Sequence, residues 1–166
     1  MDKGTKKIAL IGNPNSGKSS LFNILTGLRQ TVGNYPGVTM ERRAGICKWS
    51  EAFSSMVVDL PGTYSLIPKT TEENIVRDIL LDQDHPDHPD RIIVVADVTN
   101  LERNLLVFSQ VRDLAIPAVL LLTMQDLAEK RKMEVDISKL SALFSGVPVI
   151  MMNTRNGQGL RKLRDV

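Results

Sequence analysis

Residues 12–19 match the pattern G-x-x-x-x-G-K-[ST], whose residue types and spacing suit a phosphorylated ligand. The pattern follows an apolar run of strand length and opens a segment with helical periodicity. Glycines in such a loop let successive N–H groups point into one concavity, and the helix N-terminus adds its dipole. Lys18 is expected to reach the β- and γ-phosphates of a nucleoside triphosphate, and the Ser19 hydroxyl to bind Mg²⁺. The expected nucleotide contacts here are Asn13, Pro14, Asn15, Ser16, Gly17, Lys18, Ser19 and Ser20.

A second pattern, Asp59-Leu60-Pro61-Gly62, comes directly after another strand-length run. Asp59 is expected to act on Mg²⁺ through a bound water, and the N–H of Gly62 to contact the γ-phosphate. An Asp before Pro-Gly is by itself equally typical of a simple turn. Its position downstream of the phosphate loop favours the metal interpretation.

Residues 32–39, the first switch segment, are dense in Gly and Pro, which predicts a mobile loop. Thr39 could supply its hydroxyl to Mg²⁺ and its N–H to the γ-phosphate, with Gly37 and Val38 beside the nucleotide. Loops that a γ-phosphate orders, and that hydrolysis releases, form a switch. The alternative is an ordinary surface loop.

The sequence Thr123-Met124-Gln125-Asp126 follows a further apolar run and could read the base. An Asp there can accept hydrogen bonds from guanine N1–H and N2–H₂ together, a donor pair that adenine lacks. The alternative for Asp126 is an N-cap for a helix beginning near Leu127. Backbone N–H groups at Thr154 and Arg155 would lie near guanine O6, although a plain loop fits these residues too. The expected base contacts are Thr123, Met124, Asp126, Thr154 and Arg155.

Strand-length apolar runs alternate with helical segments along the whole chain, which predicts an α/β fold with a largely parallel sheet covered on both faces. Segments 44–50 and 54–59 are joined by a short polar link, which predicts a hairpin and one antiparallel edge strand. In such sheets the ligand lies beyond the carboxyl ends of the strands, where all these motifs fall. The expected strands are 7–12, 44–50, 54–59, 92–97, 117–122 and 147–152, and the expected helices are 17–27, 72–81, 101–115, 138–144 and 159–166.

Length, charge and composition favour a single-domain protein and argue against several classes of protein. A length of 166 residues predicts one domain, and a net charge of +2 with 4% aromatic residues argues against a nucleic-acid binder. Cys47 is the sole cysteine, so an internal disulfide is excluded and a reducing compartment is favoured. The longest apolar run, 116–122, is far short of the ~20 residues that cross a bilayer, which predicts a soluble chain. His85 and His88 lie in an Asp-rich stretch that is interpreted as a solvated loop, with a metal site as the alternative, because nothing fixes the geometry that a metal site needs.

Three segments carry a family resemblance. Residues 12–20 read GNPNSGKSS, residues 33–41 read GNYPGVTME and residues 59–66 read DLPGTYSL. Their order resembles a translation-factor-related G domain. Together with residues 100–105, NLERNL, they are similar to the N-terminal GTPase domain of the ferrous iron transport protein FeoB, over residues 8–163. The resemblance implies a P-loop GTPase fold of six to seven strands that binds GTP or GDP with Mg²⁺ and regulates ferrous iron uptake.

The resemblance also implies hydrolysis stimulated by K⁺. The Asn15 side chain would coordinate K⁺, and backbone carbonyls near Gly33 and Tyr35 would complete the cage. A cation bridging the phosphates can do the work of an arginine finger. The alternative for Asn15 is a turn residue with left-handed geometry. The residues expected to act in hydrolysis are thus Lys18, Asn15, Thr39 and Gly62.

The family further implies a bacterial inner-membrane protein, in which a cytoplasmic G domain precedes a helical domain and a transmembrane iron pathway. Residues 1–166 are then expected to be a single G domain of that protein, on the cytoplasmic face of the membrane. The partners implied are guanine nucleotide, the helical and transmembrane domains, a small cytosolic iron-transport protein and further copies of the full-length protein. Nucleic acid is not expected.

Some positions depart from the family pattern. Thr123 stands where Asn is usual and cannot bridge the base to the phosphate loop in the same way, which predicts weaker affinity and a guanine preference resting on Asp126. Thr154-Arg155-Asn156 differs from a Ser-Ala type base loop. Thr63, by contrast, fits the family: it follows Gly62 where many small GTPases outside the family carry a water-orienting Gln. Without full activation, its presence predicts turnover on the order of 10⁻⁴–10⁻² s⁻¹. A ribosome-assembly or tRNA-modification GTPase and a non-enzymatic nucleotide sensor remain alternative functions.

Overall fold

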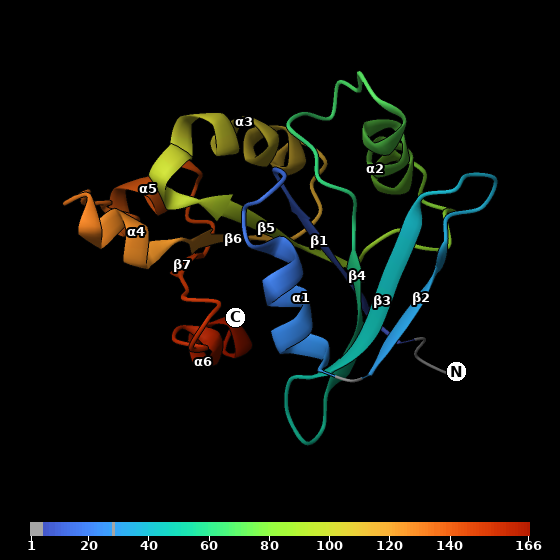
Figure 1. The fold of residues 1–166 in the computed structure, drawn as a ribbon, viewed down its shortest axis with the longest axis horizontal. Helices are drawn as coiled ribbons and strands as arrows, with labels where there is room; N and C mark the ends of the chain where they lie inside the picture. The colour runs from blue at the N-terminus through green and yellow to red at the C-terminus, as the bar shows by residue number, and fades with distance from the viewer. Residues whose placement is uncertain (1–4, 28) are drawn as a thin grey trace.

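The chain forms one seven-stranded sheet in the computed structural model, which describes residues 5–27 and 29–166 (Figure 1). Residues 1–4 and 28 of the predicted domain lie outside that description. The strands are β1 (Lys7–Gly12), β2 (Gln30–Asn34), β3 (Glu41–Lys48), β4 (Ser54–Asp59), β5 (Arg91–Asp97), β6 (Ala118–Thr123) and β7 (Val149–Met151). The helices are α1 (Lys18–Thr26), α2 (Thr71–Leu81), α3 (Leu101–Arg112), α4 (Gln125–Lys130), α5 (Ile137–Leu143) and α6 (Leu160–Arg164), with a 3-10 turn η1 (Val98–Asn100) before α3.

The sheet has the order β2-β3-β4-β1-β5-β6-β7. Pairing is parallel from β4 through β1, β5 and β6 to β7. Only the β2–β3 and β3–β4 pairs are antiparallel, so the predicted hairpin is present. The predicted α/β fold with antiparallel pairing at one edge is therefore confirmed.

Strand β2 is not among the expected strands. Residues 32–34 were expected to belong to a loop, but they pair with Arg43, Arg42 and Glu41 of β3. That part of the prediction is wrong, because Gly33 and Asn34 have low strand propensity and the strand is largely exposed, so it lacks an apolar pattern. Only the rest of the first switch segment, after Asn34, is a loop.

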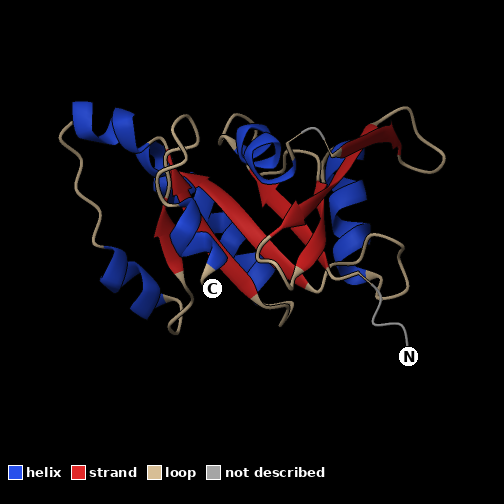
Figure 2. Cartoon of the chain, turned by 90° about the horizontal axis from the view of Figure 1, so that it is seen from below, coloured by secondary structure: helices blue, strands red, loops and turns tan. Residues whose placement is uncertain are grey.

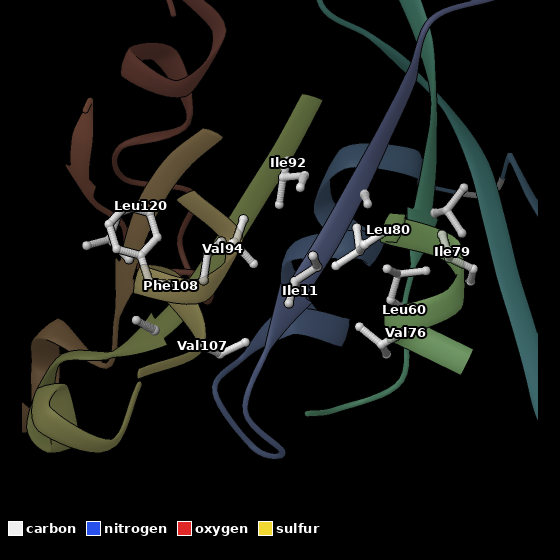
Figure 3. Packing of buried hydrophobic residues seen from close by; sticks show 14 of the residues in the cluster. Ile11, Leu60, Val76, Ile79, Leu80, Ile92, Val94, Val107, Phe108 and Leu120 are labelled. Carbon is white, nitrogen blue, oxygen red and sulfur yellow. The ribbon is translucent and has the colours of Figure 1, made fainter. Parts of the chain in front are cut away.

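Alternation along β1 divides the core between the two faces of the sheet. Ile8 and Leu10 pack on the face that α1 covers, with Phe22 of that helix. Ala9 and Ile11 pack on the opposite face, with Phe108 of α3 (Figure 3). Helices lie against both faces (Figure 2). Because β1 and β4 are parallel neighbours, the β1–α1 and β4–α2 connections leave the sheet at the same end, the carboxyl end of these strands. Helices α1 and α2 then cover opposite faces. The phosphate loop therefore lies beside the segment after Asp59.

Helix α3 ends at Arg112 rather than at the expected residue 115, since Ala115 takes a left-handed conformation with φ 57°. Within the described residues, no helix is long and apolar enough to cross a membrane.

Candidate functional site

The phosphate loop surrounds a cavity of about 500 Å³ between the end of β1 and the start of α1. Asn15 and Gly17 both have positive φ, at 63° and 90°, which turns the loop around the cavity. The lining residues are Asn13, Pro14, Asn15, Gly17, Lys18, Ser19, Ser20, Gly62 and Met124. A larger groove of about 910 Å³ lies at the other end of the strands, beside Trp49, Pro117 and Leu163, and holds none of the predicted site residues.

Lys18, which lines this cavity, forms a buried ion pair with Asp59. Asp59 ends β4 and Lys18 begins α1, so the pair joins the two elements that carry the predicted motifs. The Ser19 hydroxyl lies 3.4 Å from the other carboxylate oxygen of Asp59. A hydroxyl and a carboxylate are oxygen donors of the kind that Mg²⁺ prefers, so these residues fit that ion.

Several polar atoms of the loop are buried without a partner among the residues described. They are both side-chain polar atoms of Asn13 and the Ser16 hydroxyl. A buried polar group without a hydrogen bond costs about 1–3 kcal/mol, and such groups in a native structure mark places where a ligand or water binds. The loop is therefore built to receive polar atoms from outside the chain.

Two glycines let backbones approach each other here. A Cβ on Gly12 would lie 2.3 Å from the carbonyl oxygen of Val95 on β5. A Cβ on Gly62 would lie 2.9 Å from Pro14 Cγ, so Gly62 sits directly against the phosphate loop. The Thr63 N–H donates to the Gly12 carbonyl at 3.0 Å and holds this approach.

The second switch segment, residues 62–69, is held by the Glu73 side chain of α2. The buried Glu73 carboxylate accepts from the N–H of Lys69 at 2.8 Å and of Tyr64 at 3.3 Å. These hydrogen bonds, that of Lys69 foremost, lower the pKa of Glu73. The Thr63 hydroxyl is turned into the segment, where it donates to the Ser65 carbonyl at 2.7 Å.

The first switch segment lies apart from the cavity. Thr39 is exposed, and Gly33 pairs with Arg42 inside the sheet. The Tyr35 carbonyl accepts from the Val38 N–H at 3.2 Å, within a turn. None of residues 33–39 is among the described residues that line the cavity, so the K⁺ cage and the Thr39 contact are not assembled with Asn15 in this conformation.

The Tyr35 side chain is buried beside a second ion pair. The Arg42 guanidinium binds the buried Asp87 carboxylate through Nε at 2.6 Å and Nη2 at 2.5 Å. Burial, reinforced by the Asp87 carboxylate, raises the pKa of Tyr35 far above its ordinary value. The hydrogen bonds of Arg42 to Asp87 raise the Arg42 pKa as well. This pair fastens β3, next to the first switch segment, to the loop between α2 and β5.

The predicted base residues converge from two strand ends. Asp126 lies in the first turn of α4 and its carboxylate is 3.3 Å from Arg155 Nη1, in the loop after β7. Met124, with φ 61°, is the N-cap of α4, so the N-cap alternative for Asp126 is wrong. The fully buried Thr123 donates its hydroxyl to the Ser16 carbonyl at 2.5 Å and lies 3.2 Å from that of Ala96. Thr123 therefore does reach the phosphate loop, by a contact that the sequence did not predict.

Comparison with known proteins gives the same assignment as the motifs. A family profile described as ferrous iron transport protein B matches residues 6–166. The chain belongs to this FeoB family. The Fe(2+) transporter FeoB of Shigella flexneri is 43% identical over 157 residues, which cover 95% of this chain and 20% of the relative. The Fe(2+) transport protein A/Fe(2+) transporter FeoB fusion protein of Porphyromonas gingivalis is 42% identical, covering 96% of this chain and 18% of the relative.

Solved FeoB structures share the fold. The G domain of T. maritima FeoB matches with a TM-score of 0.87 and 38% identity, covering 97% of this chain and 95% of that one. A mutant of S. thermophilus NFeoB bound to mGDP matches with a TM-score of 0.87 and 41% identity, covering 98% of this chain and 60% of that one. The chain spans about a fifth of the length of the curated FeoB relatives it matches.

Two residues that contact the second switch segment escaped the sequence analysis. Glu73 has a recognisable signal, because Thr70 caps α2 and the Thr70-x-x-Glu73 spacing is that of a capping box. Gln110 of α3, which contacts the second switch segment, has no signal in the sequence. In the described residues no group of three or more potential metal ligands forms around His85 and His88. His85 Nδ1 instead accepts from the Asp87 N–H at 3.0 Å, which supports the loop interpretation.

Proposed function

We propose that this chain is the single G domain of a ferrous iron transporter of the FeoB family, and that it binds GTP and hydrolyses it to GDP. The observation that carries the proposal is that Lys18 and Ser19, which line the phosphate-loop cavity with Gly62, both lie against the Asp59 carboxylate at the end of β4. The GDP-bound and mGDP-bound structures of FeoB relatives support guanine nucleotide as the ligand.

When the nucleotide binds, Lys18 would exchange the Asp59 carboxylate for the phosphates as its anionic partner. Its ammonium group, now paired with Asp59, would turn to the β- and γ-phosphates of the incoming nucleotide. The buried polar atoms of Asn13 and Ser16 would find partners in the same event. Lys18 and the N–H of Gly62 would then stabilise charge on the γ-phosphoryl oxygens while water attacks phosphorus and GDP leaves.

Ser19 and Asp59 would hold Mg²⁺, joined by Thr39 once the first switch segment moves inward. When bound, Mg²⁺ would neutralise negative charge on the β- and γ-phosphates. Asn15, with the carbonyls of Gly33 and Tyr35, would hold K⁺ after the same movement. Because Thr39 is exposed and residues 33–39 lie off the cavity, GTP binding has to reorganise this segment.

Base selection would rest on Asp126, with Thr154 and Arg155 beside it. The Asp126 carboxylate is 30% exposed and Arg155 is 80% exposed, so their ion pair is weak and a base can displace it. In the full-length protein the domain would lie on the cytoplasmic face of the inner membrane and regulate iron passage. Its partners there would be its helical and transmembrane domains, a small cytosolic protein and further copies of the transporter.

Calorimetric titration with GDP and with ADP in Mg²⁺ tests the proposal. Wild type is expected to bind GDP at least tenfold more tightly than ADP, and Lys18→Ala to lose most of that affinity. Ser19→Ala serves as a second variant because it leaves the Lys18–Asp59 pair intact. Lys48→Ala is the control, since its exposed pair with Glu51 lies on a distant strand end. Absence of nucleotide binding by folded wild type would refute the proposal.

A further inference from the structure

Gln110 of α3 holds the middle of the second switch segment. Its side-chain carbonyl oxygen accepts from the Leu66 N–H at 2.7 Å and from the Ser65 hydroxyl at 3.1 Å. The Ser65 hydroxyl in turn accepts from the Ile67 N–H at 3.0 Å. One amide oxygen therefore fixes a run of successive residues through backbone as well as side-chain donors.

The helix that carries Gln110 is itself immobilised by packing. The neighbouring side chains Phe108 and Val111 are fully buried against the sheet, and Phe108 meets Phe144 edge-on at 4.8 Å between ring centroids. A helix with such a buried face cannot shift without disrupting the core. Gln110 is therefore held in a fixed position, and its contacts fix the second switch segment relative to the core.

The second switch segment begins at Gly62, which lines the wall of the phosphate-loop cavity. Gly62 lies against Pro14, and only Thr63 and Tyr64 separate it from Ser65. Two intervening residues can span roughly 10 Å between Gly62 and Ser65, and here they are further restrained by the Thr63–Gly12 and Tyr64–Glu73 hydrogen bonds. The phosphate loop on one side and the Gln110 contact on the other thus restrain the direction of the Gly62 N–H.

We propose that Gln110 is a positioning residue that keeps the Gly62 N–H directed at the γ-phosphate, and so favours GTP over GDP. The proposal rests on the proposed function. GDP has no γ-phosphate, so loss of the Gln110 contact weakens binding of GTP and leaves GDP binding unchanged. Glu73 cannot replace Gln110, because it binds Tyr64 and Lys69 at the two ends and leaves Leu66 to Gln110.

Three variants of the full chain test this role. Gln110→Leu removes the acceptor at similar side-chain length, and Gln110→Glu keeps an acceptor oxygen. Ser109→Ala is the matched control, because the Ser109 hydroxyl donates to the Leu106 carbonyl within α3 rather than to residues 62–69. The measurements are the Kd of GDP, the Kd of a non-hydrolysable GTP analogue, and amide hydrogen exchange at Leu66.

Gln110→Leu is expected to bind the GTP analogue about tenfold more weakly, with GDP affinity within twofold of wild type, and to exchange the Leu66 amide about tenfold faster. Gln110→Glu should keep most of the wild-type affinity for the GTP analogue and most of the protection of the Leu66 amide. Ser109→Ala should match wild type in both measurements. Equal losses for GDP and the analogue, or an unchanged ratio, would overturn the role of Gln110. Should Gln110→Leu fail to fold, Gln110→Asn, whose shorter side chain cannot reach Leu66, is held to the same criteria. If wild type itself binds no nucleotide, the proposed function has failed; if wild type binds and the ratio is unchanged, only the Gln110 proposal has failed.

Discussion

The hydroxyl of Thr123, at the end of β6, lies 2.5 Å from the backbone carbonyl of Ser16 in the phosphate loop. A Cβ on Gly17 would lie 3.6 Å from the Thr123 side chain, so the two segments also pack together. One buried hydrogen bond therefore connects the end of β6, where base contacts are predicted, to the phosphate loop.

Replacing Thr123 by Val keeps the shape of the side chain and removes the hydroxyl. The buried Ser16 carbonyl would lose its partner, so we expect the free energy of unfolding to fall by about 1–3 kcal/mol and GDP binding to weaken. Urea denaturation and calorimetry measure both effects. Thr123→Ser, which keeps the hydroxyl, should lose less. A Val variant as stable as wild type would show that the hydrogen bond contributes nothing.

Replacing Asp126 by Ala should abolish base selection with little effect on folding. The Asp126–Arg155 pair is exposed, so its loss should change stability by no more than about 0.5 kcal/mol. GDP and ADP should then compete equally for the site, and IDP should behave like GDP. Glu129→Ala is the control, because Glu129 lies on the same helix and its carboxylate accepts from the Gln125 amide, away from Arg155. Persistent guanine preference in Asp126→Ala would place base recognition elsewhere.

The low pKa of Glu73 predicts how stability depends on pH. Its pKa in the folded chain lies below that in the unfolded chain, so its contribution is present above the unfolded pKa and is lost as pH falls through the folded pKa. Glu73→Gln should therefore flatten the fall in stability between pH 5 and lower pH, measured by urea denaturation at each pH. Glu72→Gln, at the neighbouring position, should leave the wild-type slope. Identical slopes for Glu73→Gln and wild type would contradict this assignment.

Removal of the Tyr35 hydroxyl should stabilise the conformation described. That oxygen is buried and has no hydrogen-bond partner within residues 5–27 and 29–166. Tyr35→Phe is expected to raise the free energy of unfolding by up to about 1–3 kcal/mol. Tyr64→Phe, at an exposed tyrosine, should change it by less than about 0.5 kcal/mol. A clear loss of stability in Tyr35→Phe would mean that the hydroxyl is satisfied in solution.

The sequence predicts the interior of this fold better than its edge. Strands such as β5 and β6 were located within a residue or two, because strands buried on both faces form continuous apolar runs. Exposed β2, with Gly33 and Asn34, has no such pattern and becomes a strand only by pairing with β3.

The candidate site also has a part that the sequence predicts and a part that it does not. Lys18, Ser19 and Asp59 were predictable because phosphate and metal chemistry restricts residue type and spacing. The Gln110–Leu66 and Thr123–Ser16 contacts join residues that only the folded chain brings together. The positions of Thr39 and the other first-switch residues depend on conformation, so the motif alone does not determine them.

Phosphate release from GTP and from ATP, by the purified chain in Mg²⁺ and K⁺, tests the central claim most directly. We predict slow hydrolysis of GTP, on the order of 10⁻⁴–10⁻² s⁻¹, with ATP hydrolysed at least tenfold more slowly. Ser19→Ala should reduce the GTP rate at least about tenfold, whereas Lys48→Ala should match wild type. Folded wild-type protein that releases no phosphate from GTP, or that hydrolyses GTP and ATP at equal rates, would contradict the account.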